Sequence, residues 1–298
     1  MVNRLQASSL ALMGLLLTGG MAPMAIANPQ AETYAVDAVR LTPEPEAFLT
    51  QTAAMPAACM AQMRNNIDGI LQQASYRNGK WGVHIESLAT GEVFYSRNAD
   101  EFFIPASNIK LFTTAAALQL YDPRSPIQST SLSSWVYTTN QRSNNAYADT
   151  LFRGIGGATA IQNALEPLGV NRGSFRQVDG SGLSRQNLAT PRAIATTLRG
   201  MHQNGYGYDV FFSSLPVAGH SGTLTNRLRS TPAFGIVRAK TGTLNGVRAL
   251  SGYVDHGQFG TLIVSVLVNH PGQTGQVLVN GVDNIMVQAA RQYNCSPV

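Results

Sequence analysis

Lysine is scarce in this chain of 298 residues. Lys80, Lys110 and Lys240 are its only lysines among 21 basic residues, so arginine supplies nearly all of the positive charge. Arginine stays protonated in proteins, whereas a desolvated lysine beside another cation loses its proton. Each lysine is therefore a candidate for a role that arginine does not fill.

Several familiar signatures are absent. The net charge of +5 is mild and no basic run alternates with aromatics, so nucleic-acid binding has no support. No His-Glu-x-x-His sequence marks a zinc peptidase, and we expect neither a metal nor another cofactor. Ser181 and Ser221 do not lie in a Gly-x-Ser-x-Gly elbow, because Leu183 and Thr223 occupy its last position.

Cysteine is equally rare. Cys59 and Cys295 are too far apart in the sequence for a metal knuckle or a redox pair. In an exported protein they would form one disulfide between the ends of the folded domain. Two buried free thiols are the alternative, and the sequence leaves both open.

The first residues have the composition of an export signal. A lone Arg4, an apolar run over residues 10–17 and the small residues Ala25 and Ala27 predict a signal peptide over residues 1–27. Its removal would lower the net charge from +5 to +4. The run is too short and too glycine-broken to favour an uncleaved anchor, so we expect export to the periplasm or cell wall, with membrane attachment left open.

The rest of the chain reads as a linker and one domain. Residues 28–57 are rich in Pro, Ala and Thr and predict a linker, which leaves residues 58–298 as the folded domain. Apolar spacing and turn residues predict a helix from Ala58 to Asn78-Gly79, a hairpin over 80–95, helices over about 105–200, three strands over 235–270 and a helix over 277–292. This order predicts an α+β fold, in which an antiparallel sheet built from both ends of the chain packs against a helical subdomain.

The stretch IPASNIKLFTTAAALQL places a serine and a lysine three residues apart. Pro105 begins a predicted helix, so Ser107 lies in its first turn and Lys110 on the same face. The lysine amine then lies within hydrogen-bond reach of the serine oxygen, and the helix N-terminus offers N–H groups to an oxyanion. A serine cap followed by a solvated lysine is the alternative for this motif alone.

Two further segments carry candidate chemistry. The segment VRAKTGTLNGV, which contains Lys240, predicts a strand whose alternation places Thr241 and Thr243 on one face. Gly242 permits a ligand backbone to approach the edge of this strand, as in the binding of an extended peptide by β-addition. In TTNQRSNNAYADTLF, Ser143 either caps the following helix or relays a proton. Asn145 offers an amide to a substrate carbonyl.

Together the three motifs resemble a known family. Ser107-x-x-Lys110, Ser143-x-Asn145 and Lys240-Thr241-Gly242 occur in the order of the penicillin-recognising serine enzymes. The segments at 178–194 and 214–244 closely resemble the D-alanyl-D-alanine carboxypeptidases of peptidase family S13, the class C low-molecular-weight penicillin-binding proteins. The resemblance runs from about residue 81 to residue 290.

The resemblance implies a role for each motif residue. Ser107 would be the acylated nucleophile, Lys110 its general base and Ser143 the donor of a proton to the leaving D-alanine. The residues that would bind substrate are Asn145, Lys240, Thr241, Gly242 and Thr243, with the N–H groups of Ser107 and Thr243 as the oxyanion hole. The implied partners are peptidoglycan stem peptides ending in D-Ala-D-Ala and β-lactam antibiotics.

The family's fold is the penicillin-binding-protein/β-lactamase-like transpeptidase fold, with a five-stranded antiparallel sheet flanked by terminal helices. It would bring Cys59 and Cys295 into one neighbourhood. The proposed base requires a neutral Lys110, so its pKa must lie well below the usual value of about 10.4, through burial and a neighbouring Lys240.

One departure from the family is plain. Only 36 residues separate Ser107 from Ser143, whereas family members usually carry large extra domains there. The segment YDPRSPIQSTSL bridges the gap directly. Two other functions therefore stay open beside the carboxypeptidase or endopeptidase: a β-lactamase, and a peptidoglycan-binding scaffold without turnover.

Overall fold

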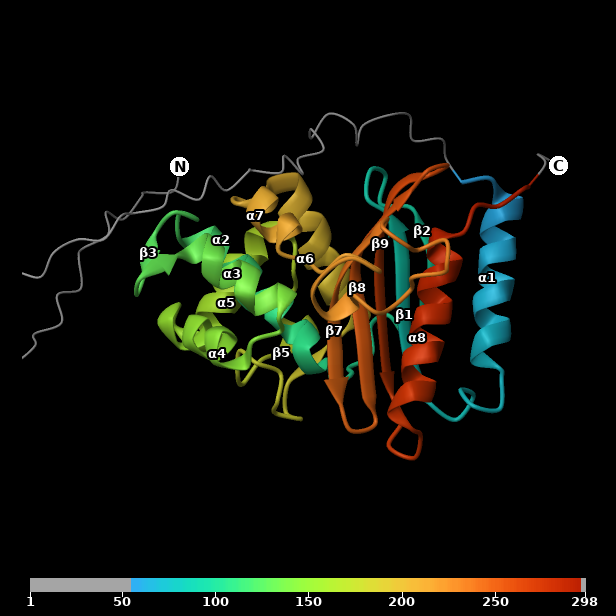
Figure 1. The fold of residues 1–298 in the computed structure, drawn as a ribbon, viewed down its shortest axis with the longest axis horizontal. Coiled ribbons are helices and arrows are strands. Elements are labelled where there is room, and N and C mark those ends of the chain that lie inside the picture. The colour runs from blue at the N-terminus through green and yellow to red at the C-terminus, as the bar shows by residue number, and fades with distance from the viewer. Residues whose placement is uncertain (1–54, 296–298) are drawn as a thin grey trace, which may run out of the picture. The chain divides into compact units, whose positions relative to one another are not determined.

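The five longest strands come from both ends of the chain and form one antiparallel sheet (Figure 1). In this computed structural model, which describes residues 55–295, the sheet has the order β2-β1-β9-β8-β7. The strands are β1 (Lys80–Ser87), β2 (Val93–Arg97), β7 (Val237–Leu244), β8 (Val247–His256) and β9 (Gly260–Asn269). The predicted hairpin, three strands and α+β class are confirmed. The predicted signal peptide, and the predicted linker up to residue 54, lie outside the described residues.

Strand β9 shows why the middle of the sheet is apolar throughout. Ile263 and Leu267 pack into one hydrophobic core, while the alternating Leu262, Val264 and Val266 pack into a second core on the other face. Successive side chains of a strand point to opposite faces, so a strand covered on both sides needs apolar residues at nearly every position. Helices must therefore cover both faces of this sheet.

The terminal helices cover one face. Helix α1 (Ala57–Leu71) buries Cys59, Met63, Ile67 and Leu71, which recur every four residues and so share one side of the helix. Helix α8 (Gly275–Ala290) packs against α1, β8 and β9. In Figure 1 these two helices, blue and red, lie side by side on the same face of the sheet.

Several predicted helix boundaries were wrong. Helix α1 ends at Leu71 instead of reaching Asn78-Gly79, and the chain then turns; in this turn the Tyr76 carbonyl accepts a 2.9 Å bond from the Trp81 indole. Helix α8 begins two residues earlier than predicted because Thr274 caps it. Helix α4 (Asn145–Gly154) begins after Asn144, one residue later than the predicted start.

The helical subdomain lies on the other face, where two of its helices contact the sheet. The helices are η2 (Ala106–Ile109), α2 (Lys110–Leu120), α3 (Leu132–Gln141), α4, α5 (Gly157–Leu165), η3 (Glu166–Leu168), η4 (Arg172–Ser174), α6 (Pro191–Asn204) and α7 (Tyr208–Ser213). Helix α6 packs on β1, β8 and β9, and η2 packs on β7 and β8. Helix α2 contacts α3, α4, α5, α6 and α7, and every residue from Lys110 to Leu118 is buried. Because α2 is packed on all sides, its first turn is held firmly in place.

The short bridge forms a small hairpin. Its strands β3 (Pro126–Ile127) and β4 (Thr130–Ser131) pair with each other. Elsewhere in the subdomain, β5 (Phe175–Arg176) pairs with β6 (Leu188–Ala189). The Leu132 N–H donates to the Ser125 carbonyl at 2.9 Å, which closes the bridge onto the start of α3. The chain thus passes from α2 to α3 without further protein between them.

A disulfide joins Cys59 to Cys295, with 5.4 Å between their Cα atoms. Of the two alternatives that the sequence left open, the structure has the bonded pair. The bond ties α1 to the segment that follows α8, so the two ends of the described chain are held together. In residues 55–295 no helix combines the length and apolarity that a bilayer span requires.

We expect reduction of this disulfide to lower the free energy of unfolding by about 2–4 kcal/mol, because the bond closes a very long loop in the unfolded chain. Urea unfolding with and without reductant measures the loss. A Cys59→Ser/Cys295→Ser variant is the control and should show the lower stability whether or not reductant is present. Equal stability of the oxidised and reduced wild type would contradict the prediction.

Candidate active site

The first turn of the buried helix brings Ser107 and Lys110 together. Ser107 lies partly exposed on η2, while the Lys110 side chain at the start of α2 is 0% exposed. The Lys110 Nζ atom donates to the Ser107 Oγ atom at 2.9 Å. Ala106, just before the serine, has a φ of +47°, a left-handed conformation that costs energy in a non-glycine residue and is typical of functional sites.

Three oxygens surround the buried amine. Besides Ser107, Lys110 Nζ donates to Asn145 Oδ1 at 2.8 Å and to the Ser181 carbonyl. Burial lowers the pKa of Lys110 to about 8. The negative charges of Asp149 and Asp179 act in the opposite direction and raise this pKa, but burial is the larger effect. The expected lowering by burial is confirmed. About a tenth of the amine is therefore neutral at pH 7, and about half at pH 8.

A second buried amine lies at Ser143. Lys240, on β7, is fully buried, and its Nζ atom donates to Ser143 Oγ at 2.9 Å and to the Thr241 carbonyl at 3.1 Å. Burial, and then the charge of Lys110, hold the pKa of Lys240 well below its usual range. The sequence predicted that Lys240 would help to lower the pKa of Lys110; instead, the charge of Lys110 lowers the pKa of Lys240, and Lys110 owes its own lowered pKa to burial.

Ser143 is not the cap of the helix that follows it. The Asn144 side chain caps α4, because its Oδ1 atom accepts from the Tyr147 N–H at 3.0 Å. Ser143 precedes the cap with a φ of +53°. Of the two readings of this serine, capping is therefore wrong, and the hydroxyl pairs with Lys240 instead.

Strand β7 is held against η2 at the Lys240-Thr241-Gly242 motif. The Asn108 side chain donates to the Lys240 carbonyl at 2.9 Å. A Cβ atom on Gly242 would lie 2.6 Å from the Pro105 carbonyl oxygen, so only glycine permits this contact. The close approach that we predicted for a ligand backbone at Gly242 is made by the protein's own backbone. Thr243 is exposed.

The loop at 178–187 contributes a group that the sequence did not predict. The Ser181 carbonyl accepts from Ser107 Oγ at 3.3 Å and from Lys110 Nζ. Asp179 folds the loop by accepting from the N–H groups of Gly182 at 2.6 Å and Ser184 at 2.8 Å. The Asp-Gly-Ser-Gly sequence signals a tight loop, but no side chain reveals that a carbonyl reaches the site.

The apparent serine-protease motif at His220-Ser221 has another role. Ser221 Oγ accepts from the Gln141 side chain at 3.3 Å and from the Val217 N–H at 3.0 Å. His220 packs on the Phe234 ring at 4.4 Å between centroids. These contacts are structural, as expected.

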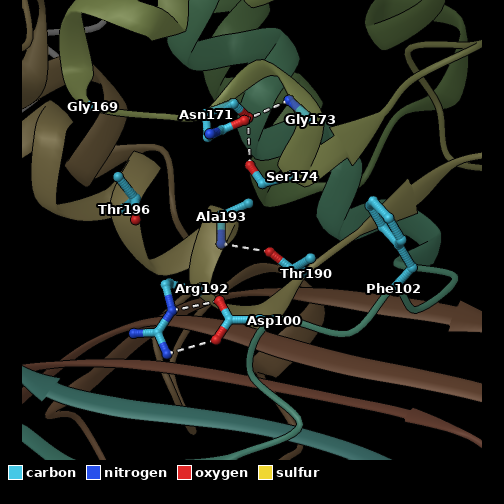
Figure 2. Close-up of a pocket in the computed structure, with 10 residues that line it drawn as sticks. All are labelled: Asp100, Phe102, Gly169, Asn171, Gly173, Ser174, Thr190, Arg192, Ala193 and Thr196. Atoms are coloured by element: carbon cyan, nitrogen blue, oxygen red, sulfur yellow. Dashed lines mark hydrogen bonds and ion pairs between the residues drawn. The ribbon is translucent and has the colours of Figure 1, made fainter.

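A separate cavity of about 470 Å³ contains none of the predicted site residues (Figure 2). It lies beside the N-terminus of α6 and is lined by Asp100, Phe102, Gly169, Asn171, Gly173, Ser174, Thr190, Arg192, Ala193 and Thr196. Arg192 forms two bonds to Asp100, at 2.6 and 2.9 Å, and Thr190 Oγ1 accepts from the Ala193 N–H at 3.0 Å. These polar groups of the cavity pair with one another, so the candidate active site remains the one at Ser107.

Comparison with solved structures identifies the fold. Penicillin-binding protein 4 from Haemophilus influenzae superposes with a TM-score of 0.65 at 15% identity, over 76% of this chain and 100% of that one. A β-lactamase from Chitinophaga pinensis gives 0.64 at 21% identity, over 77% and 98%. The predicted penicillin-binding-protein/β-lactamase-like fold is confirmed.

The profile of the D-Ala-D-Ala carboxypeptidase 3 (S13) family matches residues 63–127 and 125–292, and the chain belongs to this family. A D-alanyl-D-alanine carboxypeptidase from Actinomadura sp. (strain R39) is 41% identical over 164 residues, which are 50% of this chain and 30% of that protein. The penicillin-sensitive carboxypeptidase A of Dictyostelium discoideum is 33% identical over 174 residues, or 52% and 33%. The chain spans about a third of the length of these curated relatives. The two matched stretches meet at residues 125–127, within the short bridge.

We expect the rate of acylation by a labelled penicillin to rise with pH through about 8 and then level, because only the neutral form of Lys110, the predicted base, can accept a proton, and burial lowers its pKa to about 8. Lys110→Arg, which stays charged, should lose at least a hundredfold in rate. Lys80→Arg changes an exposed lysine paired with Glu101 and is the matched control. A rate that still climbs past pH 10 (about the pKa of free lysine) would contradict the prediction.

Gly242→Ala should reduce acylation at least tenfold and destabilise the fold by about 1–3 kcal/mol, because its Cβ atom would force β7 away from η2. The control is Gly69→Ala on α1, where a Cβ atom meets nothing within 4 Å. That change should stabilise the chain by about 0.5–1 kcal/mol and leave acylation unchanged. Thermal unfolding and penicillin labelling measure both effects, and a Gly242→Ala variant as active as wild type would refute the argument.

Proposed function

We propose that this chain is a serine D-Ala-D-Ala carboxypeptidase or endopeptidase that acts on peptidoglycan peptides through an acyl-enzyme and is acylated by penicillin. The observation that carries the proposal is the fully buried amine of Lys110, 2.9 Å from the Ser107 oxygen. A hydroxyl with a partly neutral amine at this distance is an activated nucleophile.

In the first step, Ser107 Oγ attacks the carbonyl carbon of the penultimate D-alanine while its proton passes to Lys110 Nζ. The new C–O bond converts the carbonyl to a tetrahedral oxyanion, which the N–H groups of Ser107 and Thr243 would stabilise. The Ser181 carbonyl and Asn145 Oδ1 accept from the same amine, and they hold it in place when it carries the extra proton.

In the second step, the C–N bond breaks and the leaving D-alanine takes a proton from Ser143. The bond from Lys240 Nζ to Ser143 Oγ supports this assignment, because the lysine replaces the proton that the serine gives up. Lys240 and Thr241 would bind the terminal carboxylate, with Asn145 on the peptide. The proton that Lys110 took from Ser107 then passes to Lys240, so that Lys110 is neutral again and Lys240 regains the proton it gave up. Water attacks the acyl carbon and gives a proton to Lys110, which passes it to Ser107 Oγ as the ester bond breaks and the shortened peptide leaves.

A β-lactamase is the second candidate, since β-lactamases share the fold. In class A β-lactamases, a carboxylate separate from the lysine activates the water that hydrolyses the penicilloyl ester. Within residues 55–295 no carboxylate is hydrogen-bonded to Ser107 or Lys110. The two carboxylates that act on Lys110, Asp149 and Asp179, accept from backbone N–H groups of the 178–187 loop. This arrangement favours a peptidase that keeps penicillin bound.

We further propose that the chain works outside the cytoplasm, in the periplasm or cell wall. The predicted signal peptide supports export, and the Cys59–Cys295 disulfide supports an oxidising compartment. The partners would be stem peptides ending in D-Ala-D-Ala and β-lactam antibiotics. A peptidoglycan-binding scaffold without turnover is the remaining alternative.

Release of D-alanine from a pentapeptide muropeptide should be detectable for the wild type and should fall at least a thousandfold in Ser107→Ala, which lacks the nucleophile. Ser213→Ala removes an exposed hydroxyl at the end of α7 and is the control. No D-alanine release by the wild type would favour the scaffold. Rapid catalytic turnover of a chromogenic cephalosporin would favour the β-lactamase.

A further inference from the structure

The hydroxyl of Thr241 has a neighbour that none of the three motifs contains. Thr241 Oγ1 donates to Thr223 Oγ1 at 2.8 Å, although the two residues are 18 positions apart. Thr223 lies on the short helix η5 (Gly222–Leu224) and is exposed, whereas Thr241 is 8% exposed. The pair therefore lies at the border between the buried lysine and solvent.

The segment that carries Thr223 is fixed to β7. The Ala239 N–H donates to the Pro216 carbonyl at 2.9 Å, and the Ala218 N–H donates to the Val237 carbonyl at 2.9 Å. These bonds pair residues 216–218 with the outer edge of β7, immediately before Lys240. The position of Thr223 relative to Thr241 thus follows from backbone pairing.

The same segment is fixed to the residues before Ser143. Gln141, at the end of α3, donates its side chain to Ser221 Oγ at 3.3 Å. A Cβ atom on Gly222 would lie 2.3 Å from Gln141 Oε1, and Gly222 has a φ of +56°, so glycine is required for this close contact. Thr223 is held from two sides and has little freedom to move away from Thr241.

A hydroxyl has one proton to donate. If Thr241 donates that proton to Thr223, none is left for a substrate carboxylate. If Thr223 donates instead, the Thr241 proton points to the carboxylate, and each bond of such a chain polarises the next. The second arrangement is the stronger one once an anion is bound, because a bond to a carboxylate is charge-assisted.

We propose that Thr223 is a positioning residue for the terminal carboxylate of the substrate. When the carboxylate binds, the bond reverses from its direction in this structure: the Thr223 hydroxyl donates to Thr241 Oγ1, and the Thr241 proton turns toward the carboxylate. This inference rests on the proposed function, since it assigns Thr241 to that carboxylate. Thr223, in the segment 216–224, would thus contribute to the preference of the site for substrates with a terminal carboxylate.

The test compares acylation by benzylpenicillin, which carries a carboxylate, with acylation by its methyl ester, which does not. Mass spectrometry of the intact protein gives both second-order rate constants. Thr223→Val, which removes the hydroxyl at nearly constant volume, should reduce the rate for benzylpenicillin about tenfold and leave the rate for the ester unchanged. Thr223→Ser should stay within about twofold of the wild type for both.

Two variants separate positioning from a general disturbance. Thr225→Val removes a neighbouring hydroxyl that bonds to the Gly222 carbonyl, and the ratio of the two rates should not change. In a Thr241→Val background, Thr223→Val should have no further effect on the ratio, because the two hydroxyls act in series.

Equal losses with both reagents in Thr223→Val, an unchanged ratio, or the same ratio change in Thr225→Val would each overturn the inference. Failure of the proposed function looks different. A wild type that reacts with neither reagent and releases no D-alanine would refute both proposals together.

Discussion

The burial of the Lys110 amine is the constraint on which the site depends. An amine removed from water needs hydrogen-bond acceptors around it, and leaving it without them costs several kcal/mol. The three acceptors come from three separate segments: Ser107 on η2, Asn145 at the start of α4, and the Ser181 carbonyl in the 178–187 loop. One side chain therefore fixes where these segments lie relative to one another.

A second buried amine extends the same principle to the sheet. Lys240 lies on β7 and bonds to Ser143, so it joins the sheet to the helical side just as Lys110 joins the helical segments. Burial and the charge of Lys110 lower the pKa of Lys240, so the two amines are difficult to protonate together. The Asn108 bond to the Lys240 carbonyl and the contact at Gly242 hold β7 against η2, so the two lysines keep their positions relative to each other.

The short bridge after α2, residues 121–131, leaves the hydrogen bonds around Lys110 and Lys240 intact and changes only what surrounds them. The hairpin of β3 and β4 closes the chain onto α3, where the family match is divided. No hydrogen bond of Lys110, Ser143 or Lys240 reaches into residues 121–131. Helix α2 is enclosed by α3 to α7 themselves, so its first turn keeps its place without a larger neighbouring domain.

The sequence by itself determined the five strands of the main sheet, the main helices and the three motifs, because apolar periodicity and motif order are local properties of the chain. The sequence did not predict the short strands β3–β6. It left the cysteine pairing open, extended α1 too far and left Ser143 as a possible cap. The tertiary structure decided these points, since each depends on a partner elsewhere: Cys295 for Cys59, Trp81 for the turn at Tyr76, and Lys240 for Ser143. The Ser181 carbonyl is the clearest case. Every residue has a backbone carbonyl, so only the folded chain reveals which one receives the buried amine.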